Sequence, residues 1–195
     1  MQELHGGNVA RVHLAEMESG APLVVKTGGS GGNFAIEALM LRYLAESTDL
    51  PVPAVNHANK TLLIMDWIDS GDPINDAAAR DAAKHLSALH KITAVKFGFE
   101  CDTLIGPLVQ PNPKTSRWFD FFRDHRMLFM ARQALGEGGL LPETMHRFEK
   151  LAARLDQWIE EPGAPALLHD DMWGGNVLVR NSRITRFPSI SVMQK

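Results

Sequence analysis

The sequence contains a single cysteine, Cys101, among its 195 residues. One cysteine excludes an intrachain disulfide framework and fits a reducing compartment. No apolar run approaches the roughly 20 residues that a membrane span needs, and the N-terminus lacks the apolar core of a signal peptide. The formal net charge of −3 gives no basic field for nucleic acid or an anionic membrane surface. We therefore expect a cytoplasmic protein that binds neither nucleic acid nor membranes.

Several catalytic motifs are also missing. The eight histidines form no HExxH pattern of a metal hydrolase, and the chain has no G-x-S-x-G turn of a serine hydrolase. The glycine-rich segment 27–33, TGGSGGN, lacks the Gly-Lys-Ser/Thr ending of a Walker A loop and also fails the G-x-G-x-x-G pattern. We interpret this segment as a connection between a strand and a helix.

The remaining patterns divide the chain into two halves. In the first half, alternating or β-branched runs predict strands, at 8–14, 23–26 and 61–68, and apolar residues at helical spacing predict a helix at 34–47. In the second half, amphipathic patterns predict helices at 75–92, 116–135 and 141–161. This order predicts an α+β protein with a small β-rich N-terminal lobe, residues 1–69, and a mostly helical C-terminal lobe, residues 70–195.

The strongest candidate for chemistry is HDDMWGGN, residues 169–176. Apolar runs at 166–168 and 177–179 predict two short strands that hold the polar side chains at one rim. The step from Asp171 to Asn176 matches the kinase catalytic loop H-x-D-x-x-x-x-N, in which the Asp takes or orients the proton of the attacking hydroxyl and the Asn binds Mg²⁺. The alternative is a polar turn with a capping Asp and a solvated Asn.

Two further features fit a kinase only in combination. Lys26 ends a predicted strand and Glu37 lies early in the next helix, as do the phosphate-binding lysine of kinases and its glutamate partner. An isolated pair of this kind is more often a surface lysine and a solvated glutamate, but the order of elements along the chain favours the kinase. Gly6 and Gly7 could cover phosphates with their backbone N–H groups, although a simple turn is the alternative.

These residues resemble the fructosamine (ketosamine) kinases, relatives of the aminoglycoside phosphotransferases with a protein-kinase-like, two-lobe fold. HDDMWGGN is similar to the family's HGDLWxGN. Residues 97–127, FGFECDTLIGPLVQPNPKTSRWFDFFRDHRM, are similar to its pattern FGF…IG…Q…N…W..FF…R. The tryptophan before Gly-Gly-Asn separates this family from most aminoglycoside and choline kinases.

The resemblance implies ATP-dependent phosphorylation of the sugar of small-molecule or protein-bound ketoamines, of the fructosamine or ribulosamine type, which leads to deglycation. The implied cofactors are ATP and Mg²⁺. The implied site residues are Asp171 as catalytic base, Asn176 as Mg²⁺ ligand, Lys26 and Glu37 as the pair that anchors phosphates, Gly6 and Gly7 in the phosphate-covering loop, Met65, Asp66, Trp67 and Ile68 in the hinge facing adenine, and Trp173 beside the sugar.

The sequence departs from the family's pattern near both ends and in the catalytic loop. Asp170 replaces a glycine, and its charge beside Asp171 is expected to raise a pKa there. No Asp or Glu follows Asp171, whereas the family carries a second metal-binding Asp in FDPA or IDPA. We expect the resemblance to end near Thr185 and most of the strand before Gly6 to be missing, in a chain shortened at both ends. Loss of the second Asp predicts reduced or absent activity. An aminoglycoside- or choline-type kinase and a non-catalytic, nucleotide-binding remnant stay open as alternatives.

Overall fold

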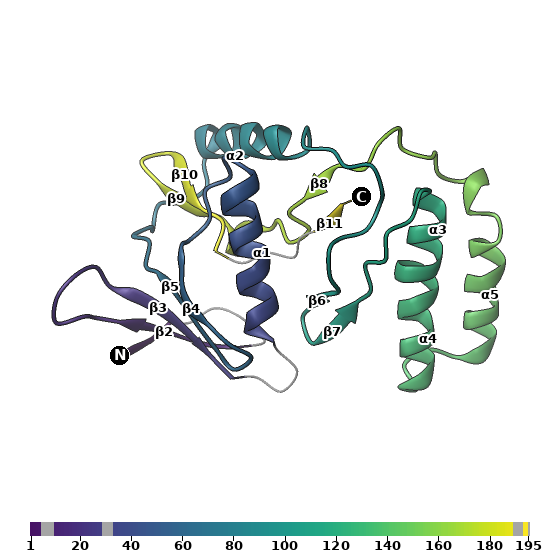
Figure 1. Ribbon diagram of the computed structural model, residues 1–195, viewed down its shortest axis with the longest axis horizontal. Coiled ribbons are helices and arrows are strands. Elements are labelled where there is room, and N and C mark those ends of the chain that lie inside the picture. The colour runs from purple at the N-terminus through teal and green to yellow at the C-terminus, as the bar shows by residue number, and fades with distance from the viewer. Residues whose placement is uncertain (5–9, 29–32, 189–192, 195) are drawn as a thin grey trace. The chain divides into compact units, whose positions relative to one another are not determined.

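The computed structural model describes residues 1–4, 10–28, 33–188 and 193–194 (Figure 1). The chain forms two compact units. The first comprises Met1–Ile92, Leu104–Leu108 and Leu168–Val192, and the second comprises Thr93–Thr103, Val109–Leu167 and Met193–Lys195. The lobe boundary after residue 69 stays a prediction. None of the described helices is long and apolar enough to cross a membrane.

A five-stranded antiparallel sheet begins the first unit, in the order β1-β2-β3-β5-β4. Its strands are β1 (Gln2–Leu4), β2 (Arg11–Ala15), β3 (Leu23–Thr27), β4 (Val55–Ala58) and β5 (Leu62–Asp66). The hairpin of β2 and β3 and the strand within 61–68 are confirmed. β1 pairs with β2, so a strand of three residues precedes the glycines. Gly6 and Gly7 themselves lie outside the described residues.

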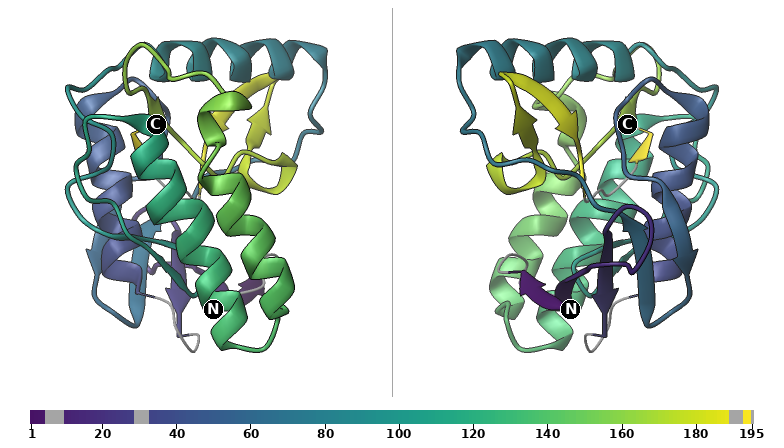
Figure 2. Two further views of the ribbon diagram at one scale, coloured as in Figure 1. Left: turned by 90° about the vertical axis from the view of Figure 1, so that its right-hand side faces the viewer. Right: turned by 90° about the vertical axis from the view of Figure 1, so that its left-hand side faces the viewer.

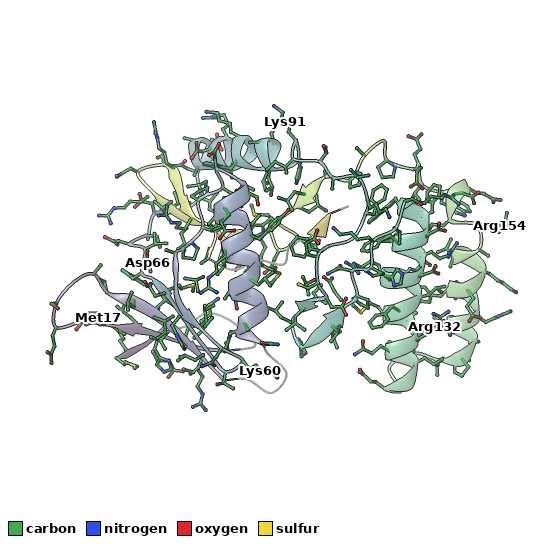
Figure 3. All side chains as sticks on the ribbon, in the orientation of Figure 1. Met17, Lys60, Asp66, Lys91, Arg132 and Arg154 are labelled. Atoms are coloured by element: carbon green, nitrogen blue, oxygen red, sulfur yellow. The ribbon has the colours of Figure 1, made fainter. Side chains whose placement is uncertain are left out.

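Helix α1 (Phe34–Ser47) confirms the helix predicted at 34–47 and packs against β4 and β5 (Figure 1). It begins after Asn33, whose side chain accepts a hydrogen bond from the backbone N–H of Ala35. Its inward face supplies fully buried apolar side chains to the core of the unit. Figure 3 labels Lys60 in the turn between β4 and β5, and Asp66 at the opposite end of β5. The sheet and α1 therefore form a packed platform that fixes the ends of β3 and β5.

The rest of the first unit contains α2 (Asp76–Leu89) and the hairpin of β9 (Leu178–Arg180) and β10 (Arg183–Arg186). Asn75 caps α2 by accepting hydrogen bonds from two backbone N–H groups. Two further short strands are β8 (Leu167–Leu168) and β11 (Met193–Gln194), of which Leu167 and β11 are counted with the second unit. The two strands predicted around the polar loop are thus present as β8 and β9.

The hairpin β9–β10 is tied to the segment that leads into α2. The carbonyl of Val179 accepts hydrogen bonds from the N–H groups of Gly71 and Asp72, at 3.3 and 3.2 Å. The Asp81 carboxylate accepts the N–H of Ile184 at 3.0 Å. Beyond the hairpin, Phe187 is fully buried and its N–H donates to the carbonyl of Pro51 at 2.9 Å. The chain therefore remains part of the folded unit past Thr185.

The second unit is mainly helical and contains α3 (Trp118–Phe122), α4 (Leu128–Gly136) and α5 (Pro142–Ala152), with α4 and α5 side by side (Figures 1 and 2). A π-helical turn, Arg123–Met127, joins α3 to α4, so the single helix predicted at 116–135 is interrupted. The helix predicted at 141–161 ends at Ala152 and is followed by a 3₁₀ turn, Leu155–Gln157. Strands β6 (Thr103–Ile105) and β7 (Leu108–Gln110) form a separate hairpin, of which Leu104–Leu108 are counted with the first unit.

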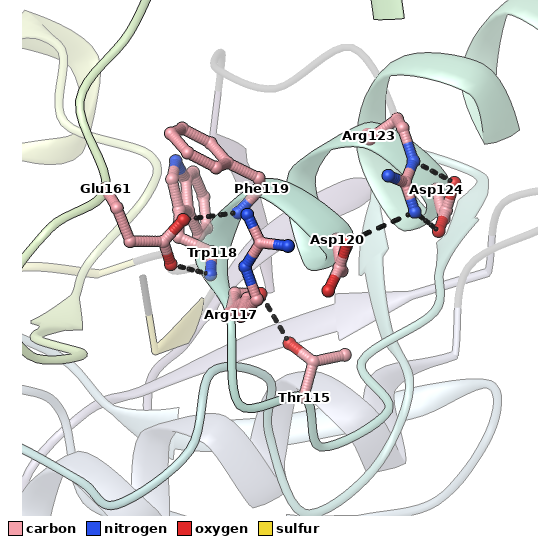
Figure 4. A network of polar contacts seen from close by, with 8 residues as sticks. All are labelled: Thr115, Arg117, Trp118, Phe119, Asp120, Arg123, Asp124 and Glu161. Carbon is pink, nitrogen blue, oxygen red and sulfur yellow. Dashed lines mark hydrogen bonds and ion pairs between the residues drawn. The ribbon is translucent and has the colours of Figure 1, made fainter. Parts of the chain in front are cut away.

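A glutamate from a distant part of the second unit caps α3. The carboxylate of Glu161 accepts hydrogen bonds from the backbone N–H groups of Trp118 and Phe119, the second at 3.2 Å (Figure 4). One turn further on, the Arg123 guanidinium contacts Asp120 at 3.2 Å and Asp124 at 2.6 Å. A negative charge at a helix N-terminus satisfies free N–H groups and complements the helix dipole. The capping group was absent from the sequence prediction because it lies 43 residues from Trp118.

Four buried polar side chains lie at the centre of the second unit, and we call them the buried polar network: Thr103, Gln110, Asn112 and Arg126. The Arg126 guanidinium donates to the Pro111 carbonyl at 2.7 Å and to the Asn112 side-chain oxygen, and it lies 4.6 Å from the centre of the Phe121 ring. The Asn112 amide in turn donates to Thr103 Oγ1 at 2.9 Å. Most of these residues belong to the pattern in 97–127 that resembles the fructosamine kinases.

Gly98 belongs to the same pattern, and its backbone conformation and surroundings require glycine. Its φ is +109°, and an added Cβ would lie 2.4 Å from the carbonyl oxygen of Pro113. A side chain at this position would therefore be strained and would also collide with backbone. The pattern in 97–127 thus describes how the second unit is built, with a close backbone approach at one end and a buried guanidinium at the other.

Candidate active site

Strand β3 and helix α1 bring Lys26 and Glu37 into contact. Lys26 Nζ lies 2.7 Å from Glu37 Oε1, and the side chains are only 12% and 17% exposed. The strand order explains this contact, because β3 lies beside β5, against which α1 packs. A partly buried ion pair has one preferred geometry and holds the ammonium group in place. The contact expected from the sequence is present, and its role in binding phosphates stays a prediction.

The catalytic-loop candidate folds around a hydrogen bond between its two polar ends. Residues Gly174–Asn176 form a 3₁₀ turn, in which the Asn176 N–H donates to the Trp173 carbonyl at 2.9 Å. The Asn176 side-chain amide donates to the carboxylate of Asp171 at 2.5 Å and to its carbonyl at 3.1 Å. Because the NH₂ group faces the carboxylate, Asn176 Oδ1 points the other way and is the atom that could face a cation.

The Asp171 carboxyl is the group whose electrostatics connect the loop to the ion pair. Burial raises the pKa of Asp171 above its ordinary value, and the hydrogen bond from Asn176 opposes this. Among the charges, Glu37 raises the same pKa and Lys26 lowers it. These interactions require Asp171 to lie within electrostatic range of both residues. The fold thus gathers one lysine and two carboxylates that lie far apart in the sequence. A carboxylate with a raised pKa is a better proton acceptor, as a general base requires.

His169 and Asp170 precede the base and differ sharply from each other. His169 is 1% exposed, its ring centre lies 5.4 Å from that of Phe187, and burial lowers its pKa to about 4. Neither ring nitrogen has a hydrogen-bond partner among the residues that the structure describes. Asp170 is exposed and has a left-handed backbone with φ +57°. The raised pKa of Asp171 has the expected direction, but its leading causes are burial and Glu37.

The hinge candidates lie at the end of β5. Met65 has a buried side chain in the core of the sheet. The N–H of Asp66 donates to the Ala54 carbonyl at 3.1 Å, and the N–H of Trp67 donates to the Pro22 carbonyl at 3.2 Å. These two backbone donors are therefore committed to the protein itself. The expected contact of Met65, Asp66, Trp67 and Ile68 with adenine stays a prediction.

The loop exposes one large apolar side chain, Trp173, which is 64% exposed. The ring of Trp173 occupies the place that a Cβ on Gly175 would take, and Ile74 from the segment before α2 lies beside Gly174. Sequence reasoning singled out Trp173 but missed Ile74, because Ile74 carries no polar or motif signal and becomes a neighbour only through the fold.

The described residues offer few oxygen ligands for Mg²⁺. They contain no group of three histidine, cysteine, aspartate or glutamate side chains placed to hold a metal ion. Near the base, the described residues offer Asn176 Oδ1, the Asp171 carboxylate and the Glu37 carboxylate, which is paired with Lys26, and residues 172–195 contain no Asp or Glu. Mg²⁺ prefers octahedral oxygen coordination with one or two carboxylates plus water or phosphate oxygens. These residues do not fit a complete Mg²⁺ site.

The profile of the family described as fructosamine kinase matches residues 1–188. The chain belongs to the fructosamine kinase family. The match ends at residue 188, close to the expected end of the resemblance near Thr185, and it includes the buried Phe187. Both the loop 169–176 and the pattern in 97–127 lie within the matched residues.

Two curated relatives illustrate the family. Over 148 residues the chain is 32% identical to a probable ketoamine kinase of Synechocystis sp., covering 73% of this chain and 49% of the relative. Over 165 residues it is 31% identical to the chloroplastic protein-ribulosamine 3-kinase of Arabidopsis thaliana, covering 78% of this chain and 49% of the relative. The chain thus spans about half the length of the curated relatives it matches.

Solved structures confirm the predicted fold class. The chain is 31% identical to a Thermobifida fusca protein assigned as a fructosamine-3-kinase, with a TM-score of 0.85 over 98% of this chain and 68% of the other. An aminoglycoside phosphotransferase crystallised with AMP-PNP and hygromycin B is 19% identical, with a TM-score of 0.67 over 100% of this chain and 68% of the other. The fold is the α+β, kinase-like fold of these phosphotransferases over part of its length.

Proposed function

We propose that this chain binds ATP and transfers its terminal phosphoryl group to a sugar hydroxyl of ketoamines, of the fructosamine or ribulosamine type, which leads to deglycation. The observation that carries the proposal is the convergence of Asp171, Lys26 and Glu37. Family membership supports the reaction class, since the named relatives are ketoamine and ribulosamine kinases.

Different residues would act on the proton of the sugar hydroxyl and on the phosphate groups of ATP. The Asp171 carboxylate, with its raised pKa, orients the sugar hydroxyl and accepts its proton. Asn176 holds that carboxylate in place through its side-chain amide. Lys26, fixed by Glu37, offers a positive charge to the nucleotide phosphates. Trp173 lies two residues from the base and would contact the sugar. Because the described residues do not complete a Mg²⁺ site, we expect turnover well below that of a kinase with a second metal-binding carboxylate.

The test is ATP turnover by the full chain with a fructosamine as acceptor, with and without Mg²⁺. Asp171→Asn removes the proton acceptor but keeps the shape and the contact with Asn176. Loss of general base catalysis lowers rates by about 10²- to 10⁴-fold, so a drop of that size is expected. Binding of a non-hydrolysable ATP analogue should survive, because the phosphate-binding pair is untouched. Equal turnover in Asp171→Asn and the unaltered chain contradicts the assignment of the base.

A nucleotide-binding protein without transfer activity is the second candidate. The lack of an Asp or Glu in residues 172–195, the stretch in which kinases place a metal-binding Asp, favours it. Retained binding of the ATP analogue with no turnover of any ketoamine supports this candidate. An aminoglycoside- or choline-type kinase is less well supported, because Trp173 and the pattern in 97–127 are features of the ketoamine kinases. A panel of phosphoryl acceptors separates the two kinase classes.

A further inference from the structure

The Trp173 indole occupies the space that a side chain at position 175 would fill. A Cβ built on Gly175 lies 2.2, 2.5 and 2.6 Å from three atoms of the six-membered ring of Trp173. Carbon atoms in contact are normally about 3.5–4.0 Å apart, so no side chain fits there while the indole keeps its place. Glycine at 175 is therefore a condition for the observed position of the indole.

The neighbouring glycine provides a contrast within the same turn. A Cβ on Gly174 has an ordinary contact, 3.8 Å from Ile74 Cδ1. Neither glycine lies in the left-handed region of φ, so the backbone tolerates a methyl group at both positions. Alanine at 174 thus changes almost nothing, whereas alanine at 175 must displace the indole. The effect of the second substitution is a moved ring and not a strained turn.

The position of the indole matters because of what lies beside it. Trp173 is 64% exposed, and Ile74, which adjoins Gly174, is 49% exposed. The same 3₁₀ turn carries Asn176, which holds the carboxylate of Asp171. The indole therefore offers an exposed aromatic face on the turn that also holds the Asp171 carboxylate. Tryptophan is well suited to bind ligands with one apolar face, because its ring gives large contact area at low cost in side-chain freedom.

We propose that Gly175 is a specificity-determining residue, which acts by placing the Trp173 indole so that the C–H face of the acceptor sugar packs on it. The inference rests on the proposed function, since it assumes a sugar acceptor at Asp171. Gly175 does not touch the acceptor and is a positioning residue. Its effect should appear in acceptor binding alone, because Lys26 and Glu37, on other elements, hold the nucleotide phosphates.

The test uses the full chain and four variants: Gly175→Ala, Gly174→Ala, Trp173→Ala and the double variant Trp173→Ala/Gly175→Ala. Calorimetric titration measures the Kd for the fructosamine of glycine and, separately, for a non-hydrolysable ATP analogue. Loss of an aromatic contact weakens binding by up to about tenfold, and we expect this for Gly175→Ala and Trp173→Ala. Gly174→Ala should bind the fructosamine within about twofold of the unaltered chain, as expected for a neutral substitution. The ATP analogue should bind all variants alike.

The double variant decides whether Gly175 acts through Trp173. If it does, the double variant binds the fructosamine no more weakly than Trp173→Ala, because the ring that the added methyl group would displace is already gone. Additive losses overturn the inference, and so does equal fructosamine binding by Gly175→Ala and Gly174→Ala. A readout independent of acceptor, acrylamide quenching of tryptophan emission, should change in Gly175→Ala and not in Gly174→Ala.

The outcomes separate the two proposals. Fructosamine binding and turnover by the unaltered chain with no effect of Gly175→Ala overturns the inference and leaves the proposed function standing. No fructosamine binding by the unaltered chain overturns the proposed acceptor and with it the role of Gly175 in specificity, even if quenching shows that the ring has moved.

Discussion

The loop 169–176 and the buried polar network of the second unit are both built from residues that resemble one family, yet they hold different kinds of polar group. In the loop, burial raises the pKa of the Asp171 carboxyl. The buried ring nitrogens of His169 have no hydrogen-bond partner among the described residues. In the network, Arg126 donates to carbonyl and amide oxygens at short range. Carboxyl groups with a shifted pKa are found mostly where function needs them, whereas a buried guanidinium needs hydrogen-bond acceptors to be stable. We therefore propose that the loop carries the chemistry and that the network is structural.

The largest expected effect on stability comes from breaking the network. Arg126→Met removes a buried guanidinium and leaves the Asn112 and Pro111 oxygens without their donor. Each buried oxygen that loses its donor costs about 1–3 kcal/mol, so the free energy of unfolding should fall by about 2–6 kcal/mol in urea titrations.

Two controls show whether the network is only structural. Arg132→Met alters an exposed arginine on α4 and should change the free energy of unfolding by no more than about 0.5 kcal/mol. In conditions where Arg126→Met is folded, its Kd for an ATP analogue should match that of the unaltered chain. A weakened Kd there contradicts the division between chemistry and construction.

The second largest expected effect is a loss of stability in acid, which protonation of His169 causes. Its pKa is about 4 in the folded chain and 6.5 in its ordinary state. Because the pKa of His169 is lower in the folded chain, its contribution to stability is complete above about pH 6.5. This contribution is lost as the pH falls towards 4. The difference corresponds to roughly 3 kcal/mol.

Unfolding experiments between pH 7 and 4 measure this loss, and two matched variants assign it. His169→Phe should flatten the part of the pH dependence that lies between 6.5 and 4, because Phe fills the site beside Phe187 without titrating. His90→Phe changes an exposed histidine at the end of α2 and should leave the slope unchanged. An unchanged slope in His169→Phe means that the buried ring is not the titrating group.

The smallest expected effect is a gain in stability at Asp170. Its φ of +57° is costly for most residues and free for glycine. Asp170→Gly should raise the free energy of unfolding by roughly 0.5–1 kcal/mol, after the greater freedom of glycine in the unfolded chain is subtracted. Asp49→Gly, at an exposed position without positive φ, should bring no gain. A loss at Asp170→Gly would show that the aspartate side chain itself stabilises the loop.

Local patterns in the sequence predicted a good part of this fold. The helix at 34–47 and the strands that carry Lys26 and flank the loop follow from hydrophobic spacing, which acts over a few positions. The π-helical turn at Arg123–Met127 was missed because its residues have ordinary helical propensities, and the interruption arises where Arg126 is buried in the network.

The residues of the candidate site were predictable from the sequence, but their detailed geometry was not. The motif spacing identified Asp171 and Asn176, and element order paired Lys26 with Glu37, whose contact the structure contains. The collision between Gly175 and the Trp173 ring depends on one rotamer and on the path of a turn, and no sequence pattern encodes these. The causes of the raised pKa of Asp171 likewise depend on burial and on charges brought close by the fold.

The most direct test of the central claim is the pKa of the Asp171 carboxyl, measured by carbon-detected NMR on labelled protein without nucleotide. The gathering of Asp171, Lys26 and Glu37 predicts a value above the ordinary 3.8 in the unaltered chain. Glu37→Gln should lower it, because a nearby negative charge is removed, and Lys26→Met should raise it, because a positive charge is removed. A pKa at or below 3.8 that neither substitution moves would contradict the claim that these three residues form one site.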